Sequence, residues 1–461
     1  MQSVVYNKVN GEILLIKRSN VNFSLNSAKR MFPGEEVGVW NCPNKYIDIK
    51  NDMVEINSSS GALCLRGEER GYKKNINASQ LIYKGVFLDH GGYANMNREI
   101  LFRLNDNVDI NVKAEIIPSP HQIDSSTFKK LKRASGNDVA TEAVKVVGFT
   151  PMQTNSRDFN ICYTMMETET LHPLFSQTLN RYYDAVITPT QWNKKIFIKG
   201  NVSKPIYVNP LGVNIDIYNE KVKKTSIVCR DVFEEKDTTI KTKFNFITLF
   251  GWSYRKGIDV LLNSYAKSFS SKDDVGLIIC SRYNGGSDVN SKNKVILDIK
   301  NILKGYENPP KIYYYGESTP SQEMPGVLKN GDCFLWASRG EGFGLPVCEA
   351  GALNIPVVST YNSGMTEFLH SDNSYLLETD EHIIANKDLT CISPYYVGQT
   401  FPKLGSKSID EYSKLLLEVY NNYDCSLKKS KVFMEEIQNK YTWDICASNL
   451  VKILKEIKEG K

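Results

Sequence analysis

Two glutamates flank a glycine-rich bend in the stretch EGFGLPVCEAGALNIPVV, which runs from Glu341 to Val358. Pro346 suits the first turn of a helix, because its ring fixes φ and it has no amide hydrogen to leave unpaired. We therefore expect a helix from Pro346 to about Leu353, whose free amides and positive dipole end point into the bend. Gly342 and Gly344 lack β-carbons and let the backbone approach an anion closely. The stretch predicts a phosphate-binding turn.

The two acids are placed to contact the groups on either side of that phosphate. Glu349 falls in the first turn of the predicted helix, near enough to its start to accept hydrogen bonds from a ribose diol. Glu341 precedes the bend and would face whatever is attached to the phosphate. A glutamate at a helix start often does no more than stabilise the helix dipole, so the prediction depends on the whole string. A nucleotide-sugar, which is rich in hydroxyls and has a diphosphate in its middle, fits the pattern.

The elements that must position these residues follow an α/β rhythm. From about residue 80 onward, short apolar strands alternate with amphipathic helical patterns, which is typical of parallel sheets covered on both faces. A charged stretch, residues 219–243, predicts a linker between two such domains, residues 76–228 and 229–440. We expect two doubly wound domains with a ligand cleft at the carboxyl ends of their strands. A β-rich module is predicted for residues 1–75, and a terminal helix that packs back on the N-terminal domain for residues 441–461.

Composition narrows the class of protein. The chain has 41% hydrophobic and 24% charged side chains, which argues against a disordered or fibrous protein. A formal net charge of +5 is too small for 461 residues to indicate a nucleic-acid partner. The ten cysteines include no C-x-x-C pair, and we expect free thiols in a reducing compartment. Since no apolar span of about 18 residues occurs, we expect a cytoplasmic protein.

The whole string resembles the E-x7-E segment of glycosyltransferase family 4, whose members are retaining enzymes of the GT-B fold. The resemblance extends over roughly residues 80–460, and three further segments contribute to it. GWSYRKGIDVLLNSY resembles the strand, loop and helix that carry an Arg/Lys pair for the donor diphosphate. YNSGMTEFL resembles the family's second glycine turn, and DHGGYANMNRE its N-domain glycine loop.

This resemblance implies a catalytic set and a donor-binding set. The catalytic residues it implies are Glu341, Arg255 and Lys256. The donor-binding residues it implies are Glu349, Gly342, Phe343, Gly344, Leu345, Gly91, Gly92, Ser363, Gly364 and Met365.

The resemblance also implies a reaction. A hexose would move from UDP or GDP to a hydroxyl of a glycan, lipid or other acceptor with retention, by front-face attack in which the leaving phosphate takes the acceptor's proton. The chain contains no D-x-D string, so we expect no metal ion and no cofactor besides the donor substrate.

Two observations leave alternatives open. Relatives often have a histidine after an N-domain strand, where this chain has Thr150 and Pro151, with His90 near the glycine loop. A phosphorylase-like or sucrose-synthase-like enzyme, or a catalytically inactive GT-B protein that binds glycans or nucleotides, therefore stays in view. Two basic groups favour either a solvated face or peripheral contact with a membrane or an acidic acceptor: Lys129, Lys130, Lys132 and Arg133, and Lys194, Lys195, Lys199 and Lys204. An oligomer formed through the predicted β-rich module, residues 1–75, is a further alternative that stays open.

Overall fold

The computed structural model describes residues 81–89, 91–106, 111–118, 131, 143–155 and 158–459, together with the backbone of six strands among the first 80 residues. The chain divides into two compact units. The first unit comprises Met1–Asn209, Ile384–Thr400 and Ala447–Lys461, and the second comprises Pro210–Ile383 and Phe401–Cys446. Each unit is described by itself.

The first unit contains a parallel six-stranded sheet with the strand order β12-β11-β10-β9-β7-β8. Its strands are β7 (Leu81–Val86), β8 (Val112–Ile117), β9 (Val144–Gly148), β10 (Phe159–Tyr163), β11 (Ala185–Thr188) and β12 (Ile206–Val208). The helices of this region are α2 (Gly92–Asn105), α4 (Pro173–Tyr182) and α5 (Gln191–Lys199). The predicted alternation of apolar strands and helices is confirmed here, because the central strands are buried on both faces.

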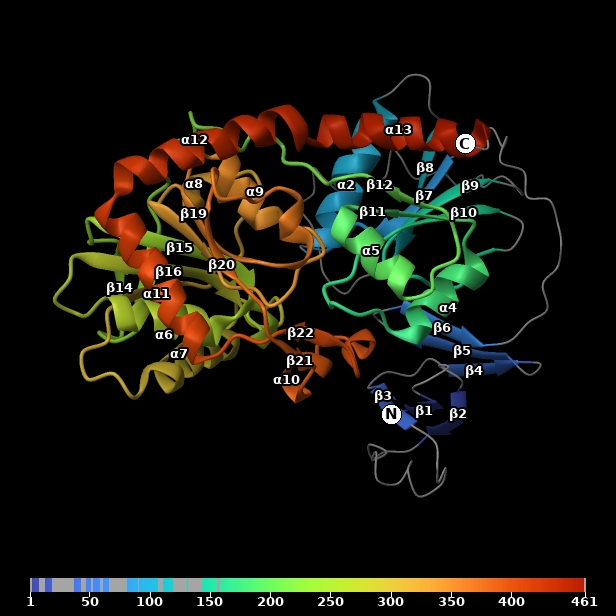
Figure 1. Ribbon diagram of the computed structural model, residues 1–461, viewed down its shortest axis with the longest axis horizontal. Coiled ribbons are helices and arrows are strands. Elements are labelled where there is room, and N and C mark those ends of the chain that lie inside the picture. Colours follow the sequence, from blue (N-terminus) through green and yellow to red (C-terminus); the bar gives the residue numbers. More distant parts are fainter. Residues whose placement is uncertain are drawn as a thin grey trace. The chain divides into compact units, whose positions relative to one another are not determined.

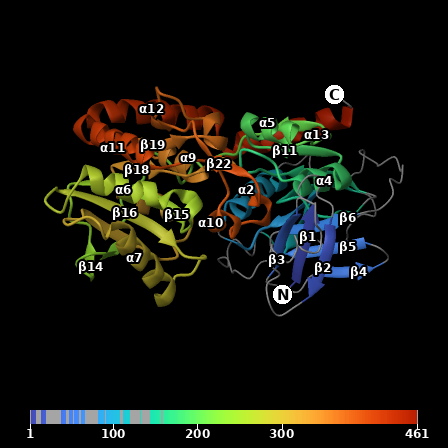
Figure 2. The same cartoon turned by 60° about the horizontal axis from the view of Figure 1, so that its bottom comes forward.

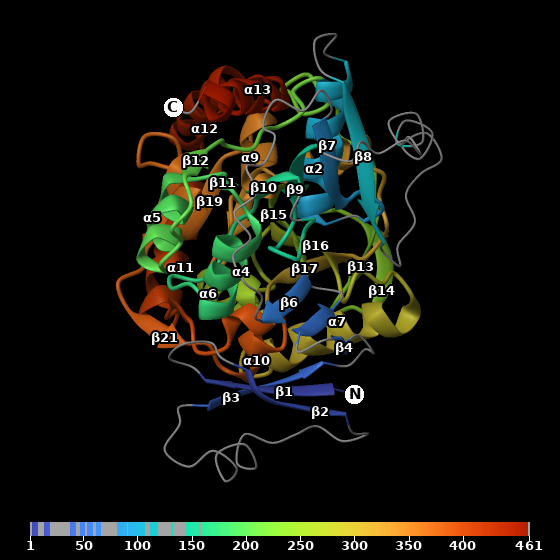
Figure 3. The same cartoon turned by 90° about the vertical axis from the view of Figure 1, so that its right-hand side faces the viewer.

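A buried asparagine fixes α2 to this sheet, and Figure 3 shows α2 against β7. Asn97 donates from its Nδ2 to the carbonyl oxygens of Val86 (3.0 Å) and Gly148 (2.8 Å). A β-carbon at Gly85 or Gly148 would collide with the Asn97 side chain, so both glycines make room for it. The amide thus satisfies carbonyl groups at the ends of two strands in an otherwise apolar interior.

The second unit contains an eight-stranded sheet with the order β14-β13-β17-β16-β15-β18-β19-β20. Its strands are β13 (Val228–Asp231), β14 (Lys236–Thr239), β15 (Phe244–Gly251), β16 (Val275–Arg282), β17 (Lys311–Tyr315), β18 (Cys333–Trp336), β19 (Val357–Tyr361) and β20 (Tyr375–Glu378). The six strands β15 to β20 pair in parallel, as expected for a doubly wound domain.

Helices cover both faces of this second sheet. Figure 1 shows α6 (Ile258–Ser268), α7 (Val289–Leu303) and α11 (Ser406–Asn421) on one side. On the other side lie α8 (Met324–Leu328), α9 (Leu345–Ala352) and α12 (Tyr423–Lys440). The predicted terminal helix is α13 (Trp443–Glu459), and its residues from Ala447 onward belong to the first unit.

The expected linker over residues 219–243 is wrong for its central part. There β13 and β14 form an antiparallel hairpin, and β13 also pairs with β17 inside the sheet. β14 is an edge strand whose residues Lys236 to Thr239 are mostly exposed. Because exposed edge strands often carry charged side chains, their composition resembles that of a solvated loop, and the sequence therefore indicates a linker here. The hairpin therefore has almost no hydrophobic pattern of its own.

The predicted β-rich module is confirmed as two three-stranded antiparallel sheets (Figure 2). One sheet has the order β2-β1-β3 and the other β4-β5-β6. The strands are β1 (Gln2–Asn7), β2 (Ile13–Arg18), β3 (Val37–Cys42), β4 (Ile47–Lys50), β5 (Met53–Ser58) and β6 (Gly61–Leu65).

A segment late in the chain, Ile384–Thr400, belongs to the first unit although its neighbours on both sides belong to the second. It contains α10 (Lys387–Thr390) and the short helix η3 (Pro394–Tyr396), between β21 (His382–Ile384) and β22 (Thr400–Pro402). Tyr395 is 2% exposed, and its ring centroid lies 5.1 Å from that of Phe175 and 6.0 Å from that of His172. The sequence did not predict this insertion into the first unit.

Two expectations drawn from composition can be compared with the described residues. The eight cysteines among them are free, and six of these are buried. Among the same residues, no helix is both long and apolar enough to cross a bilayer.

Candidate functional site

The corner after β15 places two cations at the start of a helix. The chain turns through η1 (Tyr254–Lys256) and then Gly257, whose φ of 66° precedes α6. A β-carbon at Gly257 would collide with the carbonyl oxygen of Ala337, so the turn needs glycine both for its backbone angle and for its close packing. This corner presents the side chains of Arg255 and Lys256, which the sequence predicts to bind a diphosphate.

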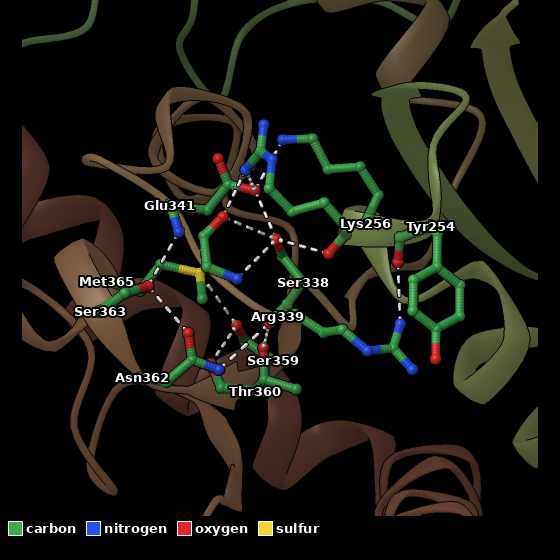
Figure 4. A network of polar contacts seen from close by, with 12 residues as sticks. Tyr254, Lys256, Ser338, Arg339, Glu341, Ser359, Thr360, Asn362, Ser363 and Met365 are labelled. Carbon is green, nitrogen blue, oxygen red and sulfur yellow. Dashed lines mark hydrogen bonds and ion pairs between the residues drawn. The ribbon is translucent and has the colours of Figure 1, made fainter. Parts of the chain in front are cut away.

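The loop after β18 carries Glu341 to these two cations (Figure 4). Its Oε1 lies 2.6 Å from Nζ of Lys256 and 3.1 Å from Nη1 of Arg255, and Oγ of Ser338 donates to the same oxygen at 2.6 Å. The Glu341 side chain is 9% exposed. β15 and β18 are neighbours in the sheet, so their carboxyl ends bring these three charged side chains together.

Electrostatics keep the Glu341 carboxylate ionised. Burial alone would raise the pKa of Glu341, but the charges of Arg255 and Lys256 and the hydrogen bonds from Lys256 and Ser338 outweigh it and lower the pKa below its usual value. At neutral pH the cluster therefore holds two cations and one anion. Its net charge of +1 suits an incoming anionic group such as a phosphate.

A third turn, after β19, is hydrogen-bonded to the backbone of Glu341. It is η2 (Ser363–Glu367), in which Ser363 has a φ of 52°. Oγ of Ser363 accepts from the Glu341 amide at 2.9 Å, and the Gly364 amide donates to the Glu341 carbonyl at 2.9 Å. A β-carbon at Gly364 would collide with the Gly342 carbonyl oxygen, and Met365 is fully buried. The three predicted residues of this turn therefore lie beside the glycine bend.

The glycine bend leads into α9 as the sequence predicts, one residue earlier than expected. Gly344 has a φ of 108°, and α9 begins at Leu345, whose side chain is buried. The Phe343 side chain is buried, and its ring centroid lies 5.1 Å from that of Phe368. Phe343 can therefore contact a ligand only through its backbone. Glu349 lies one turn into α9 and is partly exposed.

The predicted glycine loop of the first unit is an open turn. Gly91 caps α2 in an extended conformation, and its amide donates to Oδ1 of Asp89 at 2.8 Å. A β-carbon at Gly92 would meet no atom of the described residues within 4 Å.

Several other positions that the sequence singles out belong to the first unit. Thr150 and Pro151 follow β9, with Thr150 partly exposed. Lys195 and Lys199 are exposed on the outer face of α5, and Lys194 and Lys204 are partly exposed. His90 and the basic group Lys129, Lys130, Lys132 and Arg133 lie outside the described residues.

His172 has a structural role in the first unit. Its Nδ1 accepts a hydrogen bond from the Leu174 amide at 3.2 Å and so caps α4. Burial lowers the pKa of His172 to about 4, so the ring is neutral at pH 7.

Among the described residues there is no cluster of three or more His, Cys, Asp or Glu side chains that could hold a metal ion. The charged groups of the site are instead suited to an anion.

Two buried polar residues of this site, Ser338 and Arg339, do not appear in the sequence-based prediction. Both follow the apolar strand β18 directly and precede the glycine bend, and both have 0% exposure. A charged residue between a buried strand and a glycine-rich turn is the signal that could have revealed Arg339.

The family comparison covers the residues that form this site. Residues 231–388, about a third of the chain, match the family model "Glycosyl transferases group 1". In this segment the chain is similar to that family. Arg255, Lys256, Glu341 and Glu349 all lie within it.

Curated relatives are glycosyltransferases and a probable synthase. The chain is 26% identical over 234 residues to the "Phosphatidylinositol N-acetylglucosaminyltransferase GPI3 subunit" of Saccharomyces cerevisiae. The aligned residues cover 48% of this chain and 49% of the relative. It is 22% identical over 294 residues to a "Probable sucrose-phosphate synthase" of Thermosipho melanesiensis. This alignment covers 60% of this chain and 55% of the relative. The chain thus spans about half the length of these relatives.

Solved structures with a similar fold cover more of the chain. Anabaena HepE, in complex with UDP and glucose, superposes with a TM-score of 0.56 at 12% identity, over 82% of this chain and 99% of that one. A glycosyltransferase from Rickettsia africae superposes with a TM-score of 0.53 at 13% identity, over 85% of this chain and all of that one. The predicted GT-B fold is confirmed by these likenesses.

Proposed function

We propose that this protein is a retaining glycosyltransferase that transfers a hexose from a UDP- or GDP-hexose to an acceptor hydroxyl. The observation that carries the proposal is the cluster of Arg255, Lys256 and Glu341 at the carboxyl ends of β15 and β18, inside the segment that is similar to the group 1 family. Both cations lie within 3.1 Å of one carboxylate oxygen, so they can neutralise a small, highly charged group together. A departing diphosphate is such a group.

The cluster supports a front-face reaction. The bond from the anomeric carbon to the diphosphate oxygen breaks, the acceptor oxygen bonds to the same carbon, and the acceptor's proton passes to the leaving phosphate. Arg255 and Lys256 stabilise the negative charge that develops on this phosphate. Glu341 is a poor nucleophile, because it is buried and its Oε1 is engaged by Arg255, Lys256 and Ser338, so its negative charge instead orients the cations and favours positive charge on the sugar.

The donor half of the proposal is the better supported. Glu349 on α9 would hold the ribose, and backbone groups of the bend and of residues 363–365 would contact the phosphates. The UDP and glucose named for Anabaena HepE support a UDP-hexose donor. The name of the yeast relative supports a lipid acceptor, and glycans are the other class we propose.

Calorimetry with UDP and GDP, followed by turnover of their hexose donors with glycan and lipid acceptors in EDTA, tests the proposal. We expect binding of one nucleotide and metal-independent transfer with retention. Binding without transfer to any acceptor would favour the inactive GT-B alternative. A strict requirement for Mn²⁺ or Mg²⁺ would contradict the assigned diphosphate site.

A variant pair tests the role of Glu349. We expect Glu349→Ala to weaken nucleotide binding by about 1–3 kcal/mol, because ribose hydroxyls would lose a charged partner. Glu435→Ala, at an exposed position on α12, is the matched control. Equal nucleotide affinity in the two variants would remove Glu349 from the site.

A further inference from the structure

A buried arginine lies directly beneath the cationic turn. Arg339 follows β18 and is 0% exposed. Its Nη1 and Nη2 donate to the two carboxylate oxygens of Asp259 at 2.9 and 2.7 Å. Asp259 is the second residue of α6, so this bidentate pair connects the end of β18 to the first turn of the helix.

Arg339 also contacts the turn on both sides of Arg255. Its Nη1 donates to the Tyr254 carbonyl at 2.8 Å, and its backbone amide donates to the Arg255 carbonyl at 2.8 Å. The guanidinium carbon lies 3.9 Å from the centre of the Tyr254 ring (Figure 4). These contacts involve the backbone and the aromatic ring of the turn and leave its two cationic side chains directed to Glu341.

The turn has a physical reason to need this restraint. Arg255 and Lys256 lie at the N-terminal end of α6, where the helix dipole disfavours positive charge. Asp259, at 32% exposure, puts a negative charge in the first turn and offsets part of that cost. Nη1 of Arg339 then holds the turn through the Tyr254 carbonyl while the guanidinium pairs with Asp259, and a lysine cannot reproduce this planar, forked geometry.

We propose that Arg339, paired with Asp259, is a positioning residue that sets Arg255 and Lys256 at the distance needed to stabilise the leaving diphosphate. The inference rests on the proposed function. Because the cations matter most while negative charge builds on the phosphate, losing their position lowers kcat more than it raises the donor KM.

The experiment compares Arg339→Lys and Asp259→Asn with the parent enzyme. We expect each variant to lower kcat about 10-fold or more while the donor KM changes less than about 3-fold. Added to Arg255→Ala, Arg339→Lys should cost less than it does alone, because the residues act as a unit. Lys267→Ala is the control: Lys267 lies on α6, as Asp259 does, and its loss removes only an exposed ion pair with Asp410 on α11, so the variant should keep the parent's kcat.

The outcomes separate a positioning role from a structural one. A lower unfolding midpoint with kcat unchanged in the folded variants would overturn the proposal. Hydrogen exchange at the Lys256 and Gly257 amides, bonded to Ser253 and Tyr254 carbonyls, should be faster in Arg339→Lys than in the Lys267→Ala control.

A further readout distinguishes failure of this inference from failure of the proposed function. If the parent transfers no hexose, inorganic pyrophosphate binding replaces turnover. Weaker pyrophosphate binding by Arg339→Lys then supports the positioning role although the proposed function has failed. Unchanged pyrophosphate affinity and unchanged amide exchange overturn the inference.

Discussion

In each doubly wound sheet, the first strand that pairs in parallel turns into a helix at a glycine, and the two corners differ in how tightly they are packed. After β7, a β-carbon at Gly92 would meet no atom of the described residues within 4 Å. After β15, a β-carbon at Gly257 would collide with the Ala337 carbonyl. The same strand–turn–helix plan therefore gives an open corner in the first unit, with the Asp89 carboxylate bonded to the Gly91 amide, and a closed, cationic corner in the second.

Each corner is held by a different buried arginine, and the two arginines come from different kinds of element. Arg98 lies on α2 and donates to the carbonyls of Phe87 (2.7 Å) and Asp89 (2.6 Å), so the helix holds the end of its own strand. Arg339 comes from the neighbouring strand β18 and holds the turn itself through Tyr254. The cationic corner is thus held by a residue from a neighbouring strand, whereas the other corner is held by its own helix.

The largest expected effect tests the charge of the closed corner. Arg255→Ala and Lys256→Ala should each lower kcat by roughly 10²–10³, because each removes a cation that stabilises the leaving phosphate. Steady-state kinetics measures this, with Lys267→Ala as the surface control. If either variant turns over at the parent's rate, the cationic corner is not the reacting one.

The packing of the closed corner comes next. Gly257→Ala should lower the free energy of unfolding by about 2–5 kcal/mol, since alanine is strained at positive φ and its methyl group collides with the Ala337 backbone. Urea denaturation measures the loss. Gly251→Ala is the matched control, because it lies on β15 just before this turn with open space around it. Similar losses in the two variants would contradict the close packing.

The units should also differ in their response to acid. Burial holds the pKa of His172 at about 4, below its unfolded value of about 6.5, so the unfolded chain binds a proton first. Stability from a neutral His172 is therefore present above about pH 6.5 and lost as the pH falls toward 4, by roughly 3 kcal/mol. Glu341 contributes in the second unit at lower pH, since its lowered pKa gives stability that is lost only as the pH falls through the folded value.

The free energy of unfolding, measured by urea denaturation between pH 7.5 and 4, tests the loss of stability that we expect from His172. His172→Asn keeps a capping acceptor without the titration, so it should lose roughly 3 kcal/mol less than the parent over this range. His382→Asn, at an exposed position, is the control. An acid response of His172→Asn equal to that of the parent would contradict the burial argument.

The smallest effect is expected at the open corner. Gly92→Ala should change the free energy of unfolding by no more than about 0.5 kcal/mol, because the added methyl group meets no neighbour. The same denaturation assay tests it, and a loss of more than about 1 kcal/mol would show that the corner is not open. A stable variant with weaker donor binding would assign the space to the ligand.

The sequence predicts most of the fold because the strands of parallel sheets are continuous apolar runs, such as β16 and β18. Through the family resemblance it also predicts that Arg255 and Lys256 contact the donor diphosphate and that Glu341 faces the attached sugar. That they pair directly depends on β15 and β18 being neighbours, which no local pattern encodes. The Arg339–Asp259 pair could not be predicted from a local pattern either, because its two residues lie 80 positions apart in the chain. The strand β14 is missed for another reason: its exposed, charged residues have no apolar pattern that marks a strand.

The division of the chain between the two units has a consequence for biosynthesis. The first unit includes Ile384–Thr400 and Ala447–Lys461 as well as its N-terminal part. On the ribosome, Phe175 and His172 emerge long before Tyr395, which covers them in the finished molecule. Although domains generally fold in the order of synthesis, this unit cannot complete its core until almost the whole second unit has been translated. We therefore expect the apolar surface around Phe175 to stay uncovered while residues 176–395, nearly half of the chain, are being synthesised.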